Sequence, residues 1–424
     1  MLKVLQFYSI IASYLDRSPA AKRYIWYSAI MGLLGGGLGF GEVIARKSLG
    51  ASGFQVTLLA MSTPIAAFSS LWWASWIEGR DQRKILMIVG IIAFMIIATG
   101  GWLSFYVHLL AIHFFFHLAF GLFGPSENRI LQQHIASKST GRTFGNASVF
   151  RVAAAAIAAF VAGYWMENSE MGYRQVYPMA AFAGLVSLLF ITSIPTLATK
   201  SNDKLSSYQV FIQPIKDVFN LLKVRRDYLR FEMAFMLYGI AFMMILPIIP
   251  LFLVDDLQLR YDQIGLARGL ISQIVMLFSI PVFGYLFDRS TPHRLAVYIF
   301  FALSFFPILL VISGNLEGSM QMLFVYISFA FFGITMSGVH VLWSLSSIRF
   351  AAGKDAGVFH SVHIAATGIR GAFAPMLGYL IMTTMGTSVA LLCSSAVFVL
   401  ASVMMLIVRR IDKRRGEFHS LRPI

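Results

Sequence analysis

The chain has 424 residues, of which 58% are hydrophobic and only 12% are charged, against roughly a quarter charged in an ordinary soluble protein. This composition excludes a soluble globular domain and predicts a protein surrounded by lipid. The net charge of +15 would suggest nucleic-acid binding in a soluble chain, but no basic stretch accompanies a recognisable reader domain, so we expect no nucleic-acid partner.

The first 23 residues lack a small-residue cleavage site after an apolar core, so we expect them to be retained as a cytoplasmic segment. Their pattern fits a short helix at the membrane surface. Twelve apolar segments follow, each about 20 residues long and able to cross roughly 30 Å of hydrocarbon as a helix. They are expected near residues 24–45, 55–77, 85–107, 108–128, 144–166, 175–195, 230–254, 263–287, 295–313, 320–348, 356–382 and 386–408.

The placement of basic residues predicts how these segments are oriented. The loops that would face outward hold only Arg46, Lys47, Arg174 and Arg260, whereas the other loops and both ends of the chain are rich in lysine and arginine. The positive-inside rule therefore places both termini in the cytoplasm. Compact loops and the lack of a targeting segment lead us to expect a bacterial inner (plasma) membrane.

A polar, basic stretch at residues 196–227 divides the chain into halves. We expect six-helix bundles at 24–195 and 228–408, with 196–227 as a cytoplasmic central loop and 409–424 as a basic cytoplasmic tail. Within the central loop, apolar residues recur at helical spacing from Val210 to Leu222 beside lysines, which suits a helix lying on the membrane surface. A flexible loop is the alternative.

A charged turn occurs once in each half. EGRDQRK at 78–84 and DRSTPHR at 288–294 each leave one apolar segment and enter another, and their leading acids, Glu78 and Asp288, are 210 residues apart. Half-chain repeats in an apolar protein indicate a transporter built from two similar bundles.

Twelve spans, a long basic central loop and a charged turn after the second and eighth spans resemble the major facilitator superfamily over nearly the whole chain. The family's signature has a glycine, three residues, an acid, a basic residue, then a glycine and further basic residues. The second turn matches it at Gly284, Asp288, Arg289 and Arg294. The first turn matches at Glu78, Arg83 and Lys84 but has Ala74, Gly79 and Asp81 where the family has glycine, a basic residue and a second glycine.

The resemblance implies that these two turns form a gate. An ion pair that exists in one conformation and breaks in the other makes a bistable element. Glu78, Arg83, Asp288 and Arg289 would then stabilise the outward-open conformation, with Lys84, Gly284 and Arg294 in the same turns. The alternative is a solvated anchor of the topology that does not gate.

Charged or imidazole side chains within the membrane are functional candidates because burying charge in hydrocarbon is costly. Counted at about 1.5 Å per helical residue, Arg151, His340 and His363 fall near the middle of the membrane. Arg151 and His363 are 212 residues apart and so align in the two halves. The other candidates that can face a central cavity are Arg268 and Arg370, in the outer halves of their spans, and His117 and Gln273, near the middle.

Three arginines without an acid at comparable depth would give a central cavity a positive potential, and guanidinium groups bind carboxylate or phosphate in a forked geometry. This favours an anionic solute held by Arg151 and Arg370. The alternative for each arginine is a brace between helices, and for each histidine a packing role. His340 and His363 could instead titrate during a transport cycle, because imidazole changes charge near neutral pH.

The embedded acids have alternative interpretations as well. Glu42 could serve an outer gate or a proton site, or it could pair with Arg46 one turn later. Glu127 lies at the inner end of the fourth span, where a charge network at a helix end is expected. Glu232 lies near the inner end of the seventh span.

These patterns predict a secondary active transporter that works by alternating access, is coupled to a proton or sodium ion, moves a small and possibly anionic solute, and functions as a monomer in the bilayer. Efflux of amphipathic compounds is one alternative, although the fifth span lacks the proline that drug exporters of this family often carry. A non-transporting scaffold is another. No Walker loop, HExxH or Gly-x-Ser-x-Gly sequence occurs and Cys393 is the only cysteine, so we expect no enzyme, cofactor or metal site.

Overall fold

The computed structural model describes residues 18–77, 80–134, 137–195, 207–351 and 356–416. Within these ranges the regular elements are helices, and twelve helical stretches are long and apolar enough to cross a membrane. The expected fold class, twelve transmembrane helices in two six-helix bundles, is confirmed. The surface helix expected near the N-terminus lies outside the described residues.

Among the described residues, each half contains six membrane-spanning stretches of helix in succession. The first half contains α2 (Pro19–Leu38) with α3 (Gly41–Lys47), α4 (Gly53–Ala67) with α5 (Ser70–Trp76), α6 (Gln82–Ala98) with the short turn η1 (Thr99–Trp102), α7 (Tyr106–Phe120) with α8 (Phe123–His134), α9 (Ser137–Asn168) and α10 (Gly172–Ile191). The second half contains α13 (Arg226–Leu251) with η2 (Phe252–Asp256), α14 (Tyr261–Ile264) with η3 (Gly265–Ile271) and α15 (Ser272–Asp288), α16 (Pro292–Leu303) with α17 (Phe305–Gly314), α18 (Gly318–Ala351), α19 (Ala356–Met385) and α20 (Thr387–Arg414).

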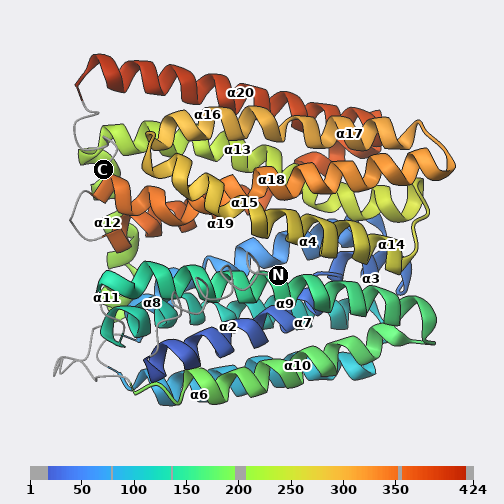
Figure 1. Ribbon diagram of the computed structural model, residues 1–424, viewed down its shortest axis with the longest axis horizontal. Helices are drawn as coiled ribbons and strands as arrows, with labels where there is room; N and C mark the ends of the chain where they lie inside the picture. Colours follow the sequence, from blue (N-terminus) through green and yellow to red (C-terminus); the bar gives the residue numbers. More distant parts are fainter. Residues whose placement is uncertain (1–17, 78–79, 135–136, 196–206, 352–355, 417–424) are drawn as a thin grey trace, which may run out of the picture.

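The two halves lie side by side, with all long helices running along the long axis of the molecule (Figure 1). We call the end that holds the start of α2 and the end of α20 the terminal end, and the opposite end, which holds α3 and α14, the distal end. Large apolar side chains such as Phe182 and Phe278 are exposed on the outer faces of the halves, as contact with lipid requires.

Two main sets of helix contacts join the halves. The first set packs α9 against α14, η3 and α15, and the second packs α4 against α19 and α13. Glycines allow the first contact, because a Cβ atom on Gly163 would lie 2.6 Å from the carbonyl oxygen of Tyr261, and one on Gly265 would lie 2.9 Å from that of Ala159. Small residues at such crossings let helix backbones approach closely.

Local sequence explains where the helices adjoining the cavity begin and break. Ser52 and Gln55 form a reciprocal capping box that starts α4. Pro64 inside α4 lacks the N–H that would continue the hydrogen-bond ladder, and the helix ends at Ala67, three residues before α5 begins. The second span is therefore broken rather than continuous.

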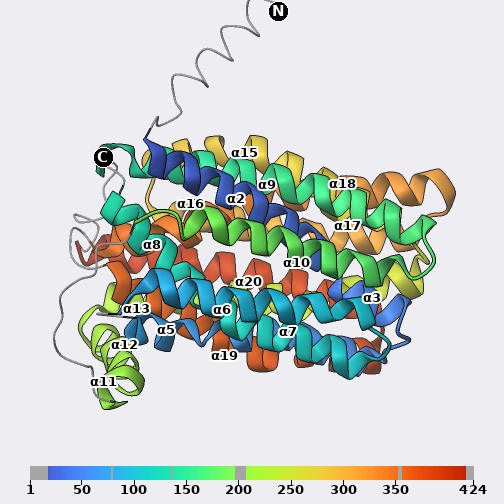
Figure 2. The same ribbon diagram turned by 90° about the horizontal axis from the view of Figure 1, so that it is seen from below.

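The central loop is helical where the structure describes it. Helices α11 (Ser207–Phe211) and α12 (Gln213–Val224) confirm the expected helix and lie at the terminal end, beside the spans (Figure 2). The last helix extends past the expected end at residue 408, because Asp412 is fully buried and bound there. Its carboxylate lies 2.6 Å from Arg230 Nη2 and 3.2 Å from His293 Nε2.

Candidate functional site

A cavity of about 630 Å³ lies between the two halves, on the terminal side of the molecule. One wall comes from α4, α5, α7 and α8 in the first half, and the other comes from α18 and α19 in the second half. Helix α12 adds Pro214 and Asp217. The cavity therefore touches both halves and the helical connection between them.

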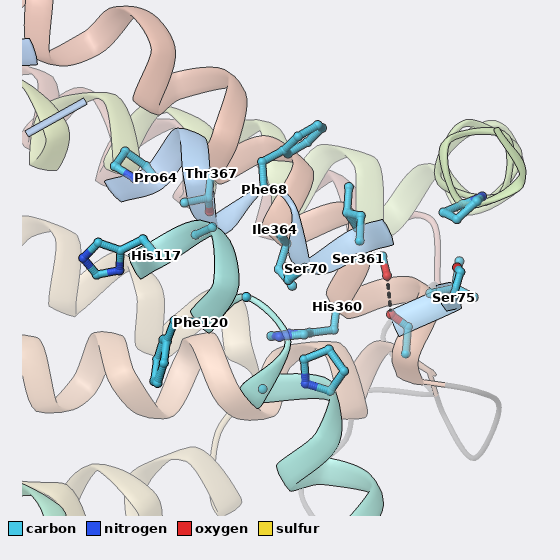
Figure 3. Close-up of a pocket in the computed structure, with 18 of the residues that line it drawn as sticks. Pro64, Phe68, Ser70, Ser75, His117, Phe120, His360, Ser361, Ile364 and Thr367 are labelled. Atoms are coloured by element: carbon cyan, nitrogen blue, oxygen red, sulfur yellow. Dashed lines mark hydrogen bonds between the residues drawn. The ribbon is translucent and has the colours of Figure 1, made fainter. Parts of the chain in front are cut away.

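The polar groups of the cavity come from both halves. His117 on α7 and His360 on α19 bring imidazoles from opposite walls (Figure 3). Ser361 and Thr367 add hydroxyl groups from α19. Among the described residues that line the cavity, none is lysine or arginine and Asp217 is the one acid. The cavity lining therefore does not carry the positive charge that we expected from the sequence.

The apolar part of the cavity is largely aromatic. Phe68 and Phe120 line the wall of the first half, and Trp343 lines that of the second. Phe68 stands where the second span is broken, and its ring lies 5.2 Å from that of Trp72 in an edge-to-face contact. A flat apolar group could therefore be held between rings, with imidazole and hydroxyl groups at its edge.

Arg151 does not line this cavity but belongs to a polar network within the first half. Its Nη2 lies 3.0 Å from Glu127 Oε2 and 3.2 Å from the hydroxyl of Ser28. The hydroxyls of Tyr24 and Tyr27 donate to the same carboxylate at 3.1 and 2.6 Å. The side chain of Arg151 nevertheless remains 38% exposed, so its guanidinium has room for a further partner.

The expectation that no acid accompanies the membrane-embedded arginines is wrong. Glu127 neutralises Arg151, and Glu42 Oε2 lies 4.0 Å from Arg268 Nη1. The proposed pairing of Glu42 with Arg46 is not found, because the Arg46 side chain turns to Asp255 in the other half. Burying a charge in hydrocarbon is costly, so a nearby opposite charge is the stable arrangement.

His363 and Arg370 occupy the interior of the second half. His363 Nδ1 lies 2.9 Å from Glu232 Oε2 on α13. Arg370 is 2% exposed, donates to the Thr367 hydroxyl at 3.0 Å, and approaches the carbonyl oxygen of Phe235 at 3.4 Å. These contacts describe a brace between α13 and α19, and they leave Arg370 behind the cavity wall.

The remaining candidates are dispersed. His340 on α18 and Gln273 on α15 are half-buried and outside the cavity lining, and no hydrogen bond joins either side chain to the residues that the structure describes. Arg151 is the charged residue that acts electrostatically on His340. The structure thus brings His117 into the cavity, places Arg370 and His363 behind its wall, and leaves the others elsewhere.

Several contacts join the halves at the distal end. Arg46 Nε donates to both oxygens of Asp255, at 2.7 and 2.9 Å. Lys47 donates to the Leu259 carbonyl at 2.8 Å, and Ser48 shares a hydrogen bond of 2.6 Å with Tyr261. We call the contacts of Arg46, Lys47 and Ser48 the distal latch. In the same region, the pKa of the Arg260 guanidinium is raised above its ordinary value, because this group is hydrogen-bonded to Asp262.

The described charged side chains of the two turns are exposed at the terminal end, namely Arg80, Asp81, Arg83, Lys84, Asp288, Arg289 and Arg294. Glu78 lies outside the described residues. Asp81 caps α6 by accepting from the N–H groups of Arg83 and Lys84, at 3.1 and 3.3 Å. Asp288 ends α15, Arg289 lies over the ring of Tyr285 at 4.1 Å, Thr291 caps α16 by accepting from the N–H of Arg294, and Gly284 has open space around its Cα. No bond between described residues joins Arg83 or Lys84 to Asp288, so gating by these turns stays a prediction.

Comparisons with known proteins agree with the transporter fold. The sequence profile of the Major Facilitator Superfamily matches residues 231–422. The solved structure of the nucleoside transporter NupG superposes with a TM-score of 0.68, covering 92% of this chain and 99% of that one at 13% identity. The second half of the chain thus matches the superfamily in sequence, and the whole chain shares the fold of a solved transporter. A structure from work on substrate recognition in proton-dependent oligopeptide transporters superposes with a TM-score of 0.67, covering 93% and 99% of the two chains at 12% identity.

No curated protein sequence matches this chain significantly. At 12–13% identity the likeness to the solved structures is one of fold, so it transfers no residue role and no substrate. The twelve apolar helices and the shared fold support a multi-pass membrane protein with a transporter fold.

Reasoning from sequence missed most of the residues that line the cavity. His360, Ser361, Thr367 and Trp343 were not singled out, because a lone imidazole, hydroxyl or aromatic group in an apolar span is usually a packing residue. One signal was available in the spacing. His360, Ile364 and Thr367 recur at helical intervals on α19 and therefore share one face.

Proposed function

We propose that this chain is a secondary active transporter that moves a small solute by alternating access and draws its energy from a proton or sodium gradient. The observation that carries this proposal is the cavity of about 630 Å³ between the halves, combined with a distal end that the latch residues close. A site reached from one end only, between two similar bundles, is what a rocking mechanism requires.

The orientation in the membrane determines which side the cavity faces. The excess of basic residues near the termini supports a cytoplasmic terminal end in a bacterial inner membrane. The cavity then faces the cytoplasm, and the distal latch closes the outer side. Each protein molecule contains a complete cavity, so a monomer suffices for transport.

The walls of the cavity favour an uncharged or weakly charged amphipathic solute. Phe68, Phe120 and Trp343 offer ring faces, while His117 and His360 offer hydrogen bonds from opposite halves. A solute that touches both walls would bind more tightly when the walls approach each other, and this differential affinity would drive closure. Direction of transport follows from the gradient and not from the cavity alone.

An anionic solute is the second candidate, and the exposure of Arg151 favours it. An anion that reached this 38% exposed guanidinium would compete with Glu127 for it. The two candidates make different demands on the protein. An amphipathic solute depends on the cavity rings and imidazoles, and an anion depends on Arg151.

Thermal stability of the purified protein across a panel of anions, cations and neutral amphiphiles tests the proposal, because a bound solute stabilises the folded state. We expect neutral amphiphiles to raise the melting temperature and the variants Trp343→Ala and His360→Gln to lose most of that rise. Arg151→Ala should retain it. The stabilising compounds are then offered to proteoliposomes, and their uptake is measured.

His108→Gln is the control for the imidazole variant His360→Gln, because His108 lies outside the cavity and binds Thr99. Loss of stabilisation in Arg151→Ala alone would make the anion the solute. Absence of flux for every stabilising compound would contradict transport and leave a scaffold role.

A further inference from the structure

The Glu232 and His363 side chains form a closely paired acid and imidazole in the interior of the second half. Nδ1 of His363 lies 3.0 and 2.9 Å from the two carboxylate oxygens of Glu232. The side chains are 6% and 3% exposed, so water does not screen the pair. Such a pair can hold one proton or two, and the two states differ by a full charge in a poorly screened place.

The pair leaves one atom without a partner. Nε2 of His363 is buried and has no hydrogen-bond partner among the residues that the structure describes. When the imidazole carries protons on both nitrogens, this Nε2–H is a donor without an acceptor, which is unfavourable in an apolar interior. A conformation that supplies an acceptor to Nε2 would therefore bind the second proton better than this one does.

The pair lies directly behind the cavity wall. The ring of Trp343, which lines the cavity, meets the ring of His363 edge to face at 4.0 Å. On α19, His360 and Thr367 line the cavity on either side of His363, and the Thr367 hydroxyl donates to the His363 carbonyl at 2.8 Å. Movement of Trp343 or of this face of α19 would therefore change the surroundings of the imidazole.

The first half has a different pair at the related place. Arg151 on α9 and His363 on α19 each contact the first helix of their own half, through Ser28 on α2 and Glu232 on α13. The guanidinium of Arg151 stays charged at every physiological pH. Of the two positions, the one on α19 carries an imidazole, which can gain or lose a proton.

Other charged and titratable groups surround the pair. Helix α13 provides the Tyr228 hydroxyl, and α19 provides His360 and Arg370, all of which act electrostatically on Glu232. Helix α18 faces the pair with Trp343. Beyond the rings of Phe231 and Phe350 lies His293 on α16, bound to Asp412 on α20, and α12 places Asp217 in the cavity.

We propose that Glu232 and His363 form a proton-binding switch whose protonation shifts the transporter away from this conformation and toward the one open at the distal end. The inference rests on the proposed alternating access. Because the proton binds more tightly where Nε2 gains an acceptor, lowering the pH must populate that conformation, and the same linkage makes the conformation control proton affinity.

Tryptophan fluorescence tests proton binding without a solute, since a protonated imidazole beside an indole quenches its emission. The signal of Trp343 is the difference between the wild type and Trp343→Phe. We expect this signal to fall as the pH is lowered and to become independent of pH in His363→Gln. His108→Gln is the control, because its imidazole lies in the other half and outside the cavity, and it should retain the response.

Distances between spin labels at Glu170 and Glu317 test the switch. Both side chains are exposed at the distal end, one in each half, and Cys393→Ser removes the native thiol. We expect the distance distribution to move to longer values from about pH 8 to about pH 5, and this response to be lost in Glu232→Gln and in His363→Asn. His108→Gln, which changes an imidazole outside the cavity, should respond as the wild type does.

A wild-type distance that ignores pH, or a response that survives in both variants, would overturn the switch. Arg46→Ala, which breaks the distal latch, separates this failure from that of alternating access. If Arg46→Ala opens the distal end but pH does not, the switch alone is wrong. If neither opens it, alternating access is wrong too.

Discussion

At the scale of single residues, Arg151 shows how an intramembrane charge can be structural. Its guanidinium, Glu127 and the hydroxyls of Tyr24 and Tyr27 satisfy one another across α2, α8 and α9. Removing one member leaves the others buried and less well paired, and the cost falls on the group that keeps its charge.

We predict that Arg151→Met destabilises the protein by about 1–3 kcal/mol, because Glu127 keeps only the tyrosine hydroxyls as partners. Glu127→Gln should cost less, and the double variant should be more stable than the sum of the two single effects implies. Melting temperatures of the wild type, the two single variants and the double variant form the double-mutant cycle that measures this coupling. Additive effects would show that the two side chains do not stabilise each other.

Sequence reasoning found Arg151 and Glu127 but did not join them. Glu127 lies in α8 and Arg151 in α9, and only the packing of α8 against α9 brings the two charges together. The Glu232–His363 contact spans 131 residues and was missed for the same reason. A single sequence shows which residues carry charge but not which helix faces meet.

At the scale of helices, α2 and α9 illustrate close packing that glycine permits. A Cβ atom on Gly36 would lie 2.5 Å from the carbonyl oxygen of Ala155, whereas one on the neighbouring Gly35 would meet nothing within 4 Å. The backbone of α9 cannot move aside as a flexible side chain could. Gly36 should therefore tolerate a larger side chain less well than Gly35 does.

We predict that Gly36→Ala lowers stability by about 1–3 kcal/mol through overpacking. Gly35→Ala should be neutral or stabilising by up to about 1 kcal/mol, because alanine is the better helix former. Parallel thermal melts of the two variants measure the contrast. Equal melting temperatures would contradict the close contact between α2 and α9.

The spans themselves were predictable from sequence because their apolar length is set by the thickness of the bilayer. The break after Pro64 and the π-helical turn η3 that carries Arg268 were not, since both depend on how neighbouring helices satisfy the freed backbone groups. The broken span gives the cavity Phe68, so this local irregularity shaped the site.

At the scale of the whole molecule, the two halves are joined differently at their two ends. The distal latch joins them through Arg46, Lys47 and Ser48, while the cavity separates them on the terminal side. The latch is partly exposed, with the Arg46 and Asp255 side chains at 33% and 36%. A contact of this kind contributes little energy and can break in each cycle.

We predict that Arg46→Ala weakens the closed distal end by up to about 1 kcal/mol, which corresponds to a shift of roughly fivefold in the ratio of the two conformations. Asp255→Ala should act in the same direction. Arg174→Ala is the control, because Arg174 lies at the same end but binds Leu103 and Ser104 within its own half. Identical distal spin-label distances in Arg46→Ala and Arg174→Ala would contradict the role of the distal latch.

The most direct measurement follows both ends of the molecule at once. Spin labels at Glu170 and Glu317 report the distal end, and labels at Lys22 and Arg410, which are exposed on α2 and α20, report the terminal end. Alternating access predicts that when Arg46→Ala lengthens the distal distance, the terminal distance shortens in the same sample. Distances that lengthen together, or a terminal distance that does not change while the distal end opens, would contradict a rocking transporter.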